Sequence, residues 1–157
     1  MSAGNQQGRL PNPWYISGFV DGDGSFHVAI YRDERMKTDW KIIPEFHVSQ
    51  RKSSQHVLHE LTAFFGCGYV KENHHAREND VTFVYVVRNR DDLTTKILPF
   101  FQRYPLRTEK RMDYERFSQI VELMNMGEHR DSRGVKRIIK IAYAMNGQGR
   151  YRRQRIV

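Results

Sequence analysis

The stretch from Ile16 to Gly24, with the sequence ISGFVDGDG, contains the residues whose types and spacing are best suited to chemistry. Asp21 and Asp23 fall at the end of a predicted helix, where the partial negative charge of the helix dipole disfavours acids. A bound cation would offset that cost. Because carboxylate oxygens suit Mg²⁺ or a similar hard ion rather than zinc, the segment predicts a divalent-cation site at a helix end.

Two glycines, Gly18 and Gly22, lie four residues apart and therefore on one face of this helix. Each costs about 1 kcal/mol relative to alanine inside a helix, so we expect a compensating benefit in packing. Small residues at this spacing allow two helix backbones to approach closely. If the partner is a second copy of the same helix, two acidic ends converge and the need for a cation doubles.

The elements that must position this segment begin with the helix itself, which Asn12 is expected to cap and Pro13 to open. Alternating apolar residues then predict two strands. Pro44, inside the second strand, indicates an edge position or a bulge. The helix, the two strands and the loop between them are expected over residues 14–20, 25–32, 40–50 and 33–39, respectively.

The rest of the chain is predicted to repeat the order helix, strand, strand and to end in helices. Ser53 or Ser54 is expected to cap the next helix. Asp91 or Asp92 is expected to open a later one, which Pro99 must kink or end. These helices and strands are expected over residues 57–65, 68–74, 81–88, 93–98, 110–126 and 135–145.

Composition and charge limit the possible classes of protein. The 157 residues carry a net charge of +8, and this length fits one domain, expected over 12–146 between a flexible tail (1–11) and a basic tail (147–157). No apolar run approaches the roughly 20 residues that cross a bilayer. The N-terminus lacks a secretory signal, and the single Cys67 excludes a disulfide framework. We therefore expect an intracellular domain with polyanionic partners, nucleic acid before anionic membrane.

The segment Ile16–Gly24, followed by Ser25-Phe26, closely resembles the signature of the LAGLIDADG homing endonucleases. Other family motifs are matched farther along, in order, at 46–51, 66–70 and 105–110, so the resemblance runs from about Trp14 to Met126. It implies a mixed α/β fold of the order αββαββα, with an antiparallel, saddle-shaped DNA-binding sheet and C-terminal helices. Because the signature occurs once, the resemblance also implies a homodimer in which Gly18, Phe19 and Gly22 form the helix contact.

The resemblance further implies roles for individual residues. Asp23 would bind the divalent metal, with the carbonyl of Gly22 as an additional ligand. Asp21 is the alternative ligand, although its position is more often structural. Gln50 would order the hydrolytic water or contact a metal. Lys110 is the best match to the basic residue of the family, and Arg107 is the alternative.

The polar face of the sheet is predicted to meet DNA, since strands laid in the major groove present alternate side chains to base edges. The candidates, including loop residues that would contact phosphates, are His27, Ala29, Tyr31, Arg32, Arg35, Lys37, Lys41, Ile43, Glu45, His47, Ser49, Arg51, Tyr69, Lys71 and Asn73. The strand over 82–87 is apolar on both faces and gives no orientation. Four histidines, expected to lie at the surface rather than to bind metal, are His56, His59, His74 and His75.

The resulting hypothesis is a site-specific endonuclease that binds a long, roughly palindromic DNA duplex as a homodimer. It would hydrolyse both strands with Mg²⁺, for which Mn²⁺ or Ca²⁺ could substitute in binding, and leave 3′ overhangs. Such enzymes are typically encoded within introns or inteins. Three alternatives stay open: an intron RNA maturase, a non-cleaving DNA-binding protein of the same fold, and a basic ribosome-associated protein. The sequence indicates neither the target site nor the organelle or organism.

Overall fold

The computed structural model describes residues 11–73 and 81–146, and every structural statement below concerns these residues. The predicted tails, apart from Pro11, and the predicted strand end at His74 lie outside them. The elements in chain order are α1 (Pro13–Asp23), β1 (Gly24–Arg32), β2 (Trp40–Arg51), the 3₁₀ turn η1 (Lys52–Ser54), α2 (His56–Phe65), β3 (Tyr69–Asn73), β4 (Thr82–Val87), α3 (Arg90–Asp92), the π-helical turn η2 (Leu93–Ile97), α4 (Leu98–Arg103), α5 (Lys110–Asn125), the 3₁₀ turn η3 (Glu128–Arg130) and α6 (Ser132–Tyr143). This order confirms the predicted αββαββα arrangement with C-terminal helices.

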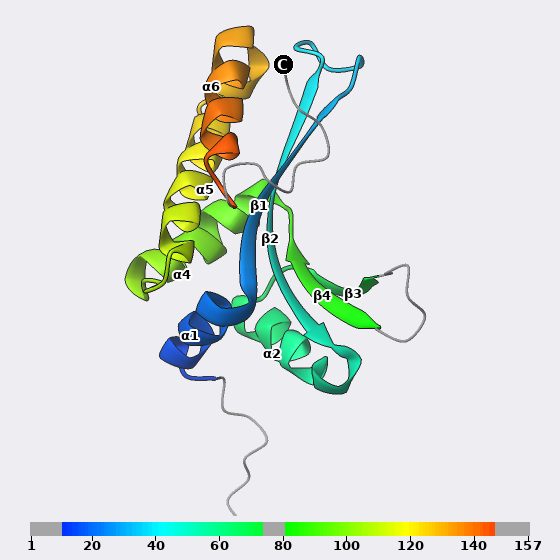
Figure 1. Cartoon of the computed structure of the whole chain (residues 1–157), viewed down its shortest axis with the longest axis vertical. Helices are drawn as coiled ribbons and strands as arrows, with labels where there is room; N and C mark the ends of the chain where they lie inside the picture. The colour runs from blue at the N-terminus through cyan, green and yellow to red at the C-terminus, as the bar shows by residue number, and fades with distance from the viewer. Residues whose placement is uncertain (1–10, 74–80, 147–157) are drawn as a thin grey trace, which may run out of the picture.

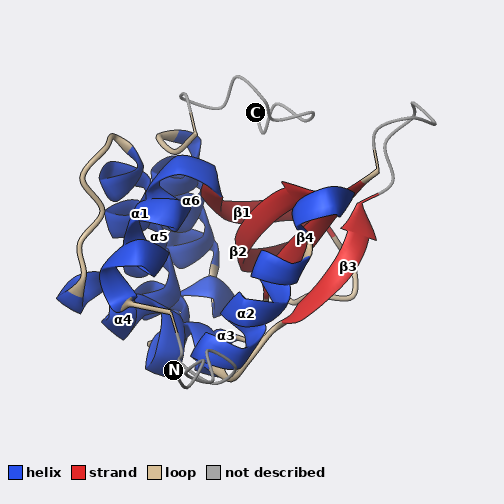
Figure 2. Cartoon of the chain, turned by 90° about the horizontal axis from the view of Figure 1, so that it is seen from below, coloured by secondary structure: helices blue, strands red, loops and turns tan. Residues whose placement is uncertain are grey.

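The four strands form one antiparallel sheet in the order β1-β2-β4-β3. The helices gather on one side of this sheet, and the described residues place no helix on its other side (Figures 1 and 2). Residues directly opposite each other on paired strands share a face, so the register assigns each strand position to the core or to the open face. Phe26 pairs with Phe46, and Phe46 pairs with Val87, which places this row in the core.

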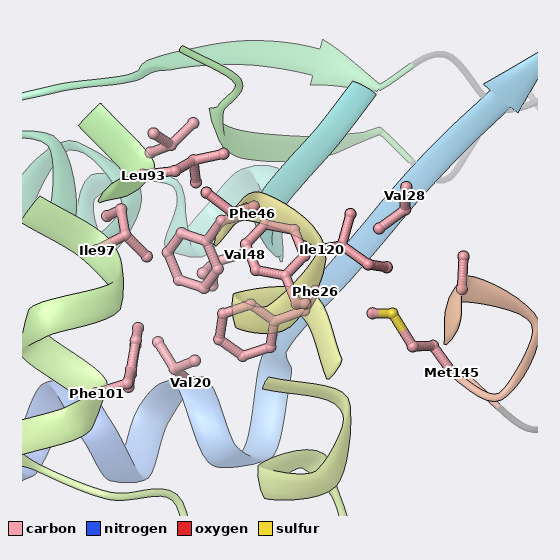
Figure 3. Packing of buried hydrophobic residues seen from close by; sticks show 14 of the residues in the cluster. Val20, Phe26, Val28, Phe46, Val48, Leu93, Ile97, Phe101, Ile120 and Met145 are labelled. Atoms are coloured by element: carbon pink, nitrogen blue, oxygen red, sulfur yellow. The ribbon is translucent and has the colours of Figure 1, made fainter. Parts of the chain in front are cut away.

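Aromatic side chains from the sheet and the helices fill the centre of the core (Figure 3). The ring of Phe26 lies 5.2 Å from that of Phe46 and 5.6 Å from that of Phe101 on α4, and all three side chains are buried. Loss of one such ring costs about 3–5 kcal/mol. This packing fixes β1 and β2 against the helices, and thereby fixes the end of α1, which leads directly into β1.

Several helix ends differ from the predicted ones. Asn12 caps α1 as expected, its side chain accepting from the backbone N–H of Trp14 at 2.8 Å, but the helix continues to Asp23 instead of ending at Val20. Gln55, and neither Ser53 nor Ser54, stands at the N-cap of α2, because the serines belong to the preceding 3₁₀ turn. The later helix is capped by Asn89 rather than by Asp91 or Asp92, because the amide of Asn89 accepts from the N–H of Asp92 at 3.0 Å.

The two prolines are accommodated by their surroundings. β4 pairs with β2 only over Phe46–Arg51, so Pro44 has β1 on one side and no described strand on the other, which is the predicted edge position. Pro99 does not end a helix, because it is the second residue of α4, where proline is tolerated, and the five-residue π-helical turn η2 directly precedes that helix. Among the helices described, none is long and apolar enough to cross a membrane.

Candidate active site and nucleic-acid interface

Asp23 and Gln50 meet where the end of α1 joins the sheet. Asp23 is the last residue of α1, and its exposed carboxylate accepts a hydrogen bond from Nε2 of Gln50 at 2.6 Å. The register explains the contact, because Gly24 pairs with Val48 and so brings the end of the helix beside the end of β2. A side chain at position 24 would lie 2.6 Å from Cγ1 of Val20, so glycine is required at this junction.

Asp21 makes a different set of contacts, to the loop that precedes α5. Its carboxylate accepts from the backbone N–H of Arg107 at 3.0 Å, from that of Thr108 at 3.2 Å and from the Thr108 hydroxyl at 2.6 Å. Burial alone would raise the pKa of Asp21, but these hydrogen bonds and the charge of Lys110 hold it below its usual value. In this structure the Asp21 carboxylate is therefore occupied in tying α1 to α5.

Lys110, the first residue of α5, reaches the C-terminal end of α1. Its ammonium donates to the carbonyl oxygens of Val20, Asp21 and Gly22 at 3.0, 2.9 and 3.2 Å. Burial lowers the pKa of Lys110, and the neighbouring aspartates oppose that shift. This ammonium supplies a positive charge at the helix end, where the sequence argument had expected only a bound cation. The backbone N–H of Arg107 donates to the Asp21 carboxylate, and Arg107 is exposed to solvent.

The glycine face of α1 is open in the single chain. A Cβ at Gly18 or Gly22 would meet no atom within 4 Å beyond its chain neighbours and the helix backbone, while the opposite face buries Ile16 and Val20. Phe19 is half-buried beside this exposed stripe. The glycines are therefore not required by packing within the chain, and their face is available to a partner.

The carboxylate oxygens of Asp23 are suitable ligands for a hard divalent cation, but such a cation takes roughly six or more ligands and one chain supplies few of them. The described residues contain no group of three His, Cys, Asp or Glu side chains able to hold a metal ion. His56 and His59 are exposed on α2, as expected, and His74 and His75 lie outside the described residues. Asp23 could hold a hard divalent cation, but the described residues of one chain do not complete a metal centre around it.

The strand residues predicted to meet base edges lie on the open face of the sheet, whereas Arg32, expected in the loop, is the last residue of β1 and alternates to the other face. The pairs His27–Glu45, His47–Val86 and Val86–Tyr69 run across the four strands on this face. The register and the alternation of burial assign to this open face the residues His27, Ala29, Tyr31, Lys41, Ile43, Glu45, His47, Ser49, Arg51, Tyr69, Lys71 and Asn73. Arg32 ends β1, and Arg35 and Lys37 are exposed in the following loop, where Asp33 holds the Arg35 guanidinium by two contacts of 2.8 Å.

The orientation of β4, which the sequence left undetermined, follows from its pairing. Tyr85 and Val87 belong to the core, whereas Val84 and Val86 lie on the open face. Both valines on the open face are nevertheless buried, at 4% and 0% exposure, between neighbouring strands. The open face therefore has an apolar centre, and its polar side chains surround these two residues.

A cluster of charged groups lies beside these valines and includes a residue that the sequence analysis missed. Glu45 is 7% exposed, and its two carboxylate oxygens lie 2.6 Å from Nη2 of Arg88 and 2.8 Å from Nε2 of His47. Burial would raise the pKa of Glu45, but His47, Arg88 and His27 lower it. Arg88 follows Val84 and Val86 at the same alternation of two, and that pattern would have indicated it had the face of β4 been known.

An antiparallel sheet with one open face, beside an exposed aspartate at a glycine-rich helix end, is suited to a protein that binds and processes nucleic acid. Comparison with known proteins identifies the family: the chain matches the family model described as LAGLIDADG endonuclease over residues 16–121 and belongs to this family.

Individual relatives agree with that assignment. Probable intron-encoded endonuclease 3 of Neurospora crassa is 32% identical over 135 residues, which are 86% of this chain and 25% of the relative. DNA endonuclease I-CeuI of Chlamydomonas moewusii is 27% identical over a region that covers 74% of this chain and 54% of the length of I-CeuI. This chain thus spans between about a quarter and about half of these curated relatives.

Solved structures confirm the fold. The homing endonuclease I-TnaI is 38% identical, with a TM-score of 0.81 over 88% of this chain and 90% of that one. I-SmaMI bound to uncleaved DNA target in the presence of calcium ions is 37% identical, with a TM-score of 0.81 over 87% of this chain and 45% of that one. The sheet and helices predicted from the sequence are therefore those of the family.

Proposed function

We propose that this protein is a homing endonuclease that binds a long, roughly palindromic DNA site as a homodimer and cleaves both strands. The observation that carries the proposal is the position of Asp23, exposed at the end of α1 and hydrogen-bonded to Gln50. It lies at the end of the helix whose open face presents Gly18 and Gly22. Pairing of two such helices would bring two Asp23 carboxylates together.

In this arrangement Asp23, Gln50 and Lys110 would have different roles in the hydrolysis of the phosphodiester bond. A divalent cation bound by the two Asp23 carboxylates, and by Gly22 carbonyls where the contact with Lys110 allows, would supply Lewis-acid chemistry for in-line displacement at phosphorus. Gln50, already fixed against Asp23, would orient the attacking water with its remaining amide atoms. Lys110 would place its ammonium near the charge that develops on the phosphate. We favour Lys110 over Arg107 for this task because its ammonium lies at the end of α1.

The open face of the sheet would supply binding. A homodimer carries twice the +8 charge of one chain, so phosphate contacts should dominate affinity and make it fall steeply with salt. The polar side chains around Val84 and Val86 would lie against the major groove, where base pairs are distinguishable. DNA as the partner is supported by the structural relative I-SmaMI, which is bound to a DNA target.

The proposal is tested by incubating the full chain with a randomised duplex library, with Mg²⁺ or with EDTA, and sequencing the product ends. We expect one pseudo-palindromic sequence to be cut in both strands, with 3′ overhangs and only in the presence of the metal ion. Sedimentation should give twice the 18.7 kDa of one chain. Selective binding without cleavage would favour a non-cleaving DNA-binding protein, and a monomer would contradict the shared site.

A further inference from the structure

The cluster around Glu45 lies on the open face of the sheet and joins β1, β2 and the residue that follows β4. Glu45 on β2 stands opposite His27 on β1, and it contacts His47 two residues along its own strand and Arg88 beyond the end of β4. An acid on a surface that meets phosphates is unfavourable unless its charge is compensated. Here the charge of Glu45 is compensated by the guanidinium of Arg88, and the second carboxylate oxygen lies against the His47 ring.

Glu45 cannot itself contact a base in this conformation. Its side chain is 9% exposed, and the contacts to Arg88 and His47 use one oxygen each. A glutamate that reads a base must accept from cytosine N4, which requires a carboxylate oxygen that is exposed at the surface. The Arg88 side chain, in contrast, is 46% exposed, and the contact engages Nη2 of a guanidinium that carries five N–H donors.

We propose that Glu45 is a positioning residue that holds Arg88 for recognition of one guanine in each half of the DNA target. The inference rests on the proposed function, because it assumes that this face meets the major groove. Arginine pairs with O6 and N7 of guanine through two donors in a fixed fork, so its direction decides whether it discriminates. An arginine already held by a buried carboxylate loses little conformational freedom when it binds, and its preference for guanine is accordingly sharper.

The test compares target preferences, position by position, for the wild type and two variants selected on the same randomised duplex library in Ca²⁺. Glu45→Gln keeps the shape of the side chain but removes the negative charge that holds Arg88, and Arg88→Lys keeps the positive charge beside Glu45 but removes the fork. We expect both variants to lose, by about ten-fold or more, the preference for guanine at the same position of each half-site, with the other positions retained.

Glu60→Gln is the matched control, because it removes an exposed acid from α2, on the helical side of the sheet. It should leave every base preference unchanged, and thermal melting should show that all variants are folded. The inference is overturned if the Glu45 and Arg88 variants keep the preference of the wild type, or if they weaken all positions equally, as a merely structural role would. If the wild type selects no sequence at all, the proposed function itself fails.

Discussion

Replacing Asp21 with alanine should loosen the junction between α1 and α5 and lower the stability of the whole domain. The substitution removes the acceptor for three donors, which are the backbone N–H groups of Arg107 and Thr108 and the Thr108 hydroxyl. These contacts join residues more than 80 positions apart in the chain and, together with the Lys110 ammonium, they connect α1 to the start of α5. They also hold the loop that leads into Lys110.

The magnitude follows from the kind of hydrogen bond that is lost. A hydrogen bond to a charged group contributes about 1.5–3 kcal/mol when buried, but Asp21 is only half-buried and water can replace part of each contact. We therefore expect a loss of about 2 kcal/mol in the free energy of unfolding for the set of three. For a domain of this size that loss corresponds to a fall in Tm of roughly 4–8 °C.

The assay is thermal and urea unfolding, with Asp21→Asn added to isolate the charge. The folded-state pKa of Asp21 lies below the ordinary 3.8, so its charge stabilises the protein fully above that pH and progressively less as the pH falls through the folded pKa. The stability difference between the wild type and Asp21→Asn should thus be constant from pH 7 to about 5 and should shrink below 3.8.

Asp33→Ala is the control for this prediction. Asp33 also accepts several hydrogen bonds, all from Arg35 within one exposed loop, so its loss should hardly change Tm. If the two alanine variants melt at the same temperature, or if the Asp21→Asn difference grows on acidification, the reasoning about the α1–α5 junction is refuted.

Two further predictions concern the helix pair and the catalytic ammonium. Gly18→Leu should give a folded monomer without cleavage activity, because a Cβ there meets no neighbouring atom within 4 Å in the single chain, while the larger side chain would block a second helix. Sedimentation checks this prediction, and an intact dimer would contradict it. Gly24→Ala is its counterpart, since a Cβ there lies 2.6 Å from Val20 and should lower Tm instead. Lys110→Met should reduce the rate of cleavage by about 10²-fold or more with DNA affinity retained, as measured by single-turnover kinetics and by binding in Ca²⁺; unchanged cleavage would remove Lys110 from the mechanism.

Local patterns in the sequence were enough to predict the order of elements and the face of β1 and β2. The alternation of Phe26 and Val28 with polar residues predicts which face of β1 is buried. Asn12-Pro13 predicts the start of α1, because asparagine caps a helix and proline favours its first position. The end of α1 could not be predicted in this way. The ammonium that satisfies its last carbonyls comes from Lys110, almost 90 residues later, and no local rule connects the two.

The same limitation applies to the candidate site. The approach of Gln50 to Asp23 depends on the register of β1 against β2, and the role of Glu45 depends on Arg88 from the other neighbouring strand. From the sequence Glu45 had the properties of a base-reading residue, because alternation places it on the open face. Only the tertiary structure reveals that Glu45 is buried and that its two oxygens lie against Arg88 and His47.

Asp23→Asn shows whether Asp23 is the residue on which metal-dependent cleavage depends. The substitution keeps the size of the side chain and an oxygen that can accept from Gln50, while it removes the charge that a divalent cation requires. Cleavage of the selected DNA duplex in Mg²⁺ should fall to background, while sedimentation still gives a dimer and the DNA is bound in Ca²⁺ with affinity within a few-fold of the wild type. Cleavage by Asp23→Asn at a rate close to that of the wild type would contradict the account.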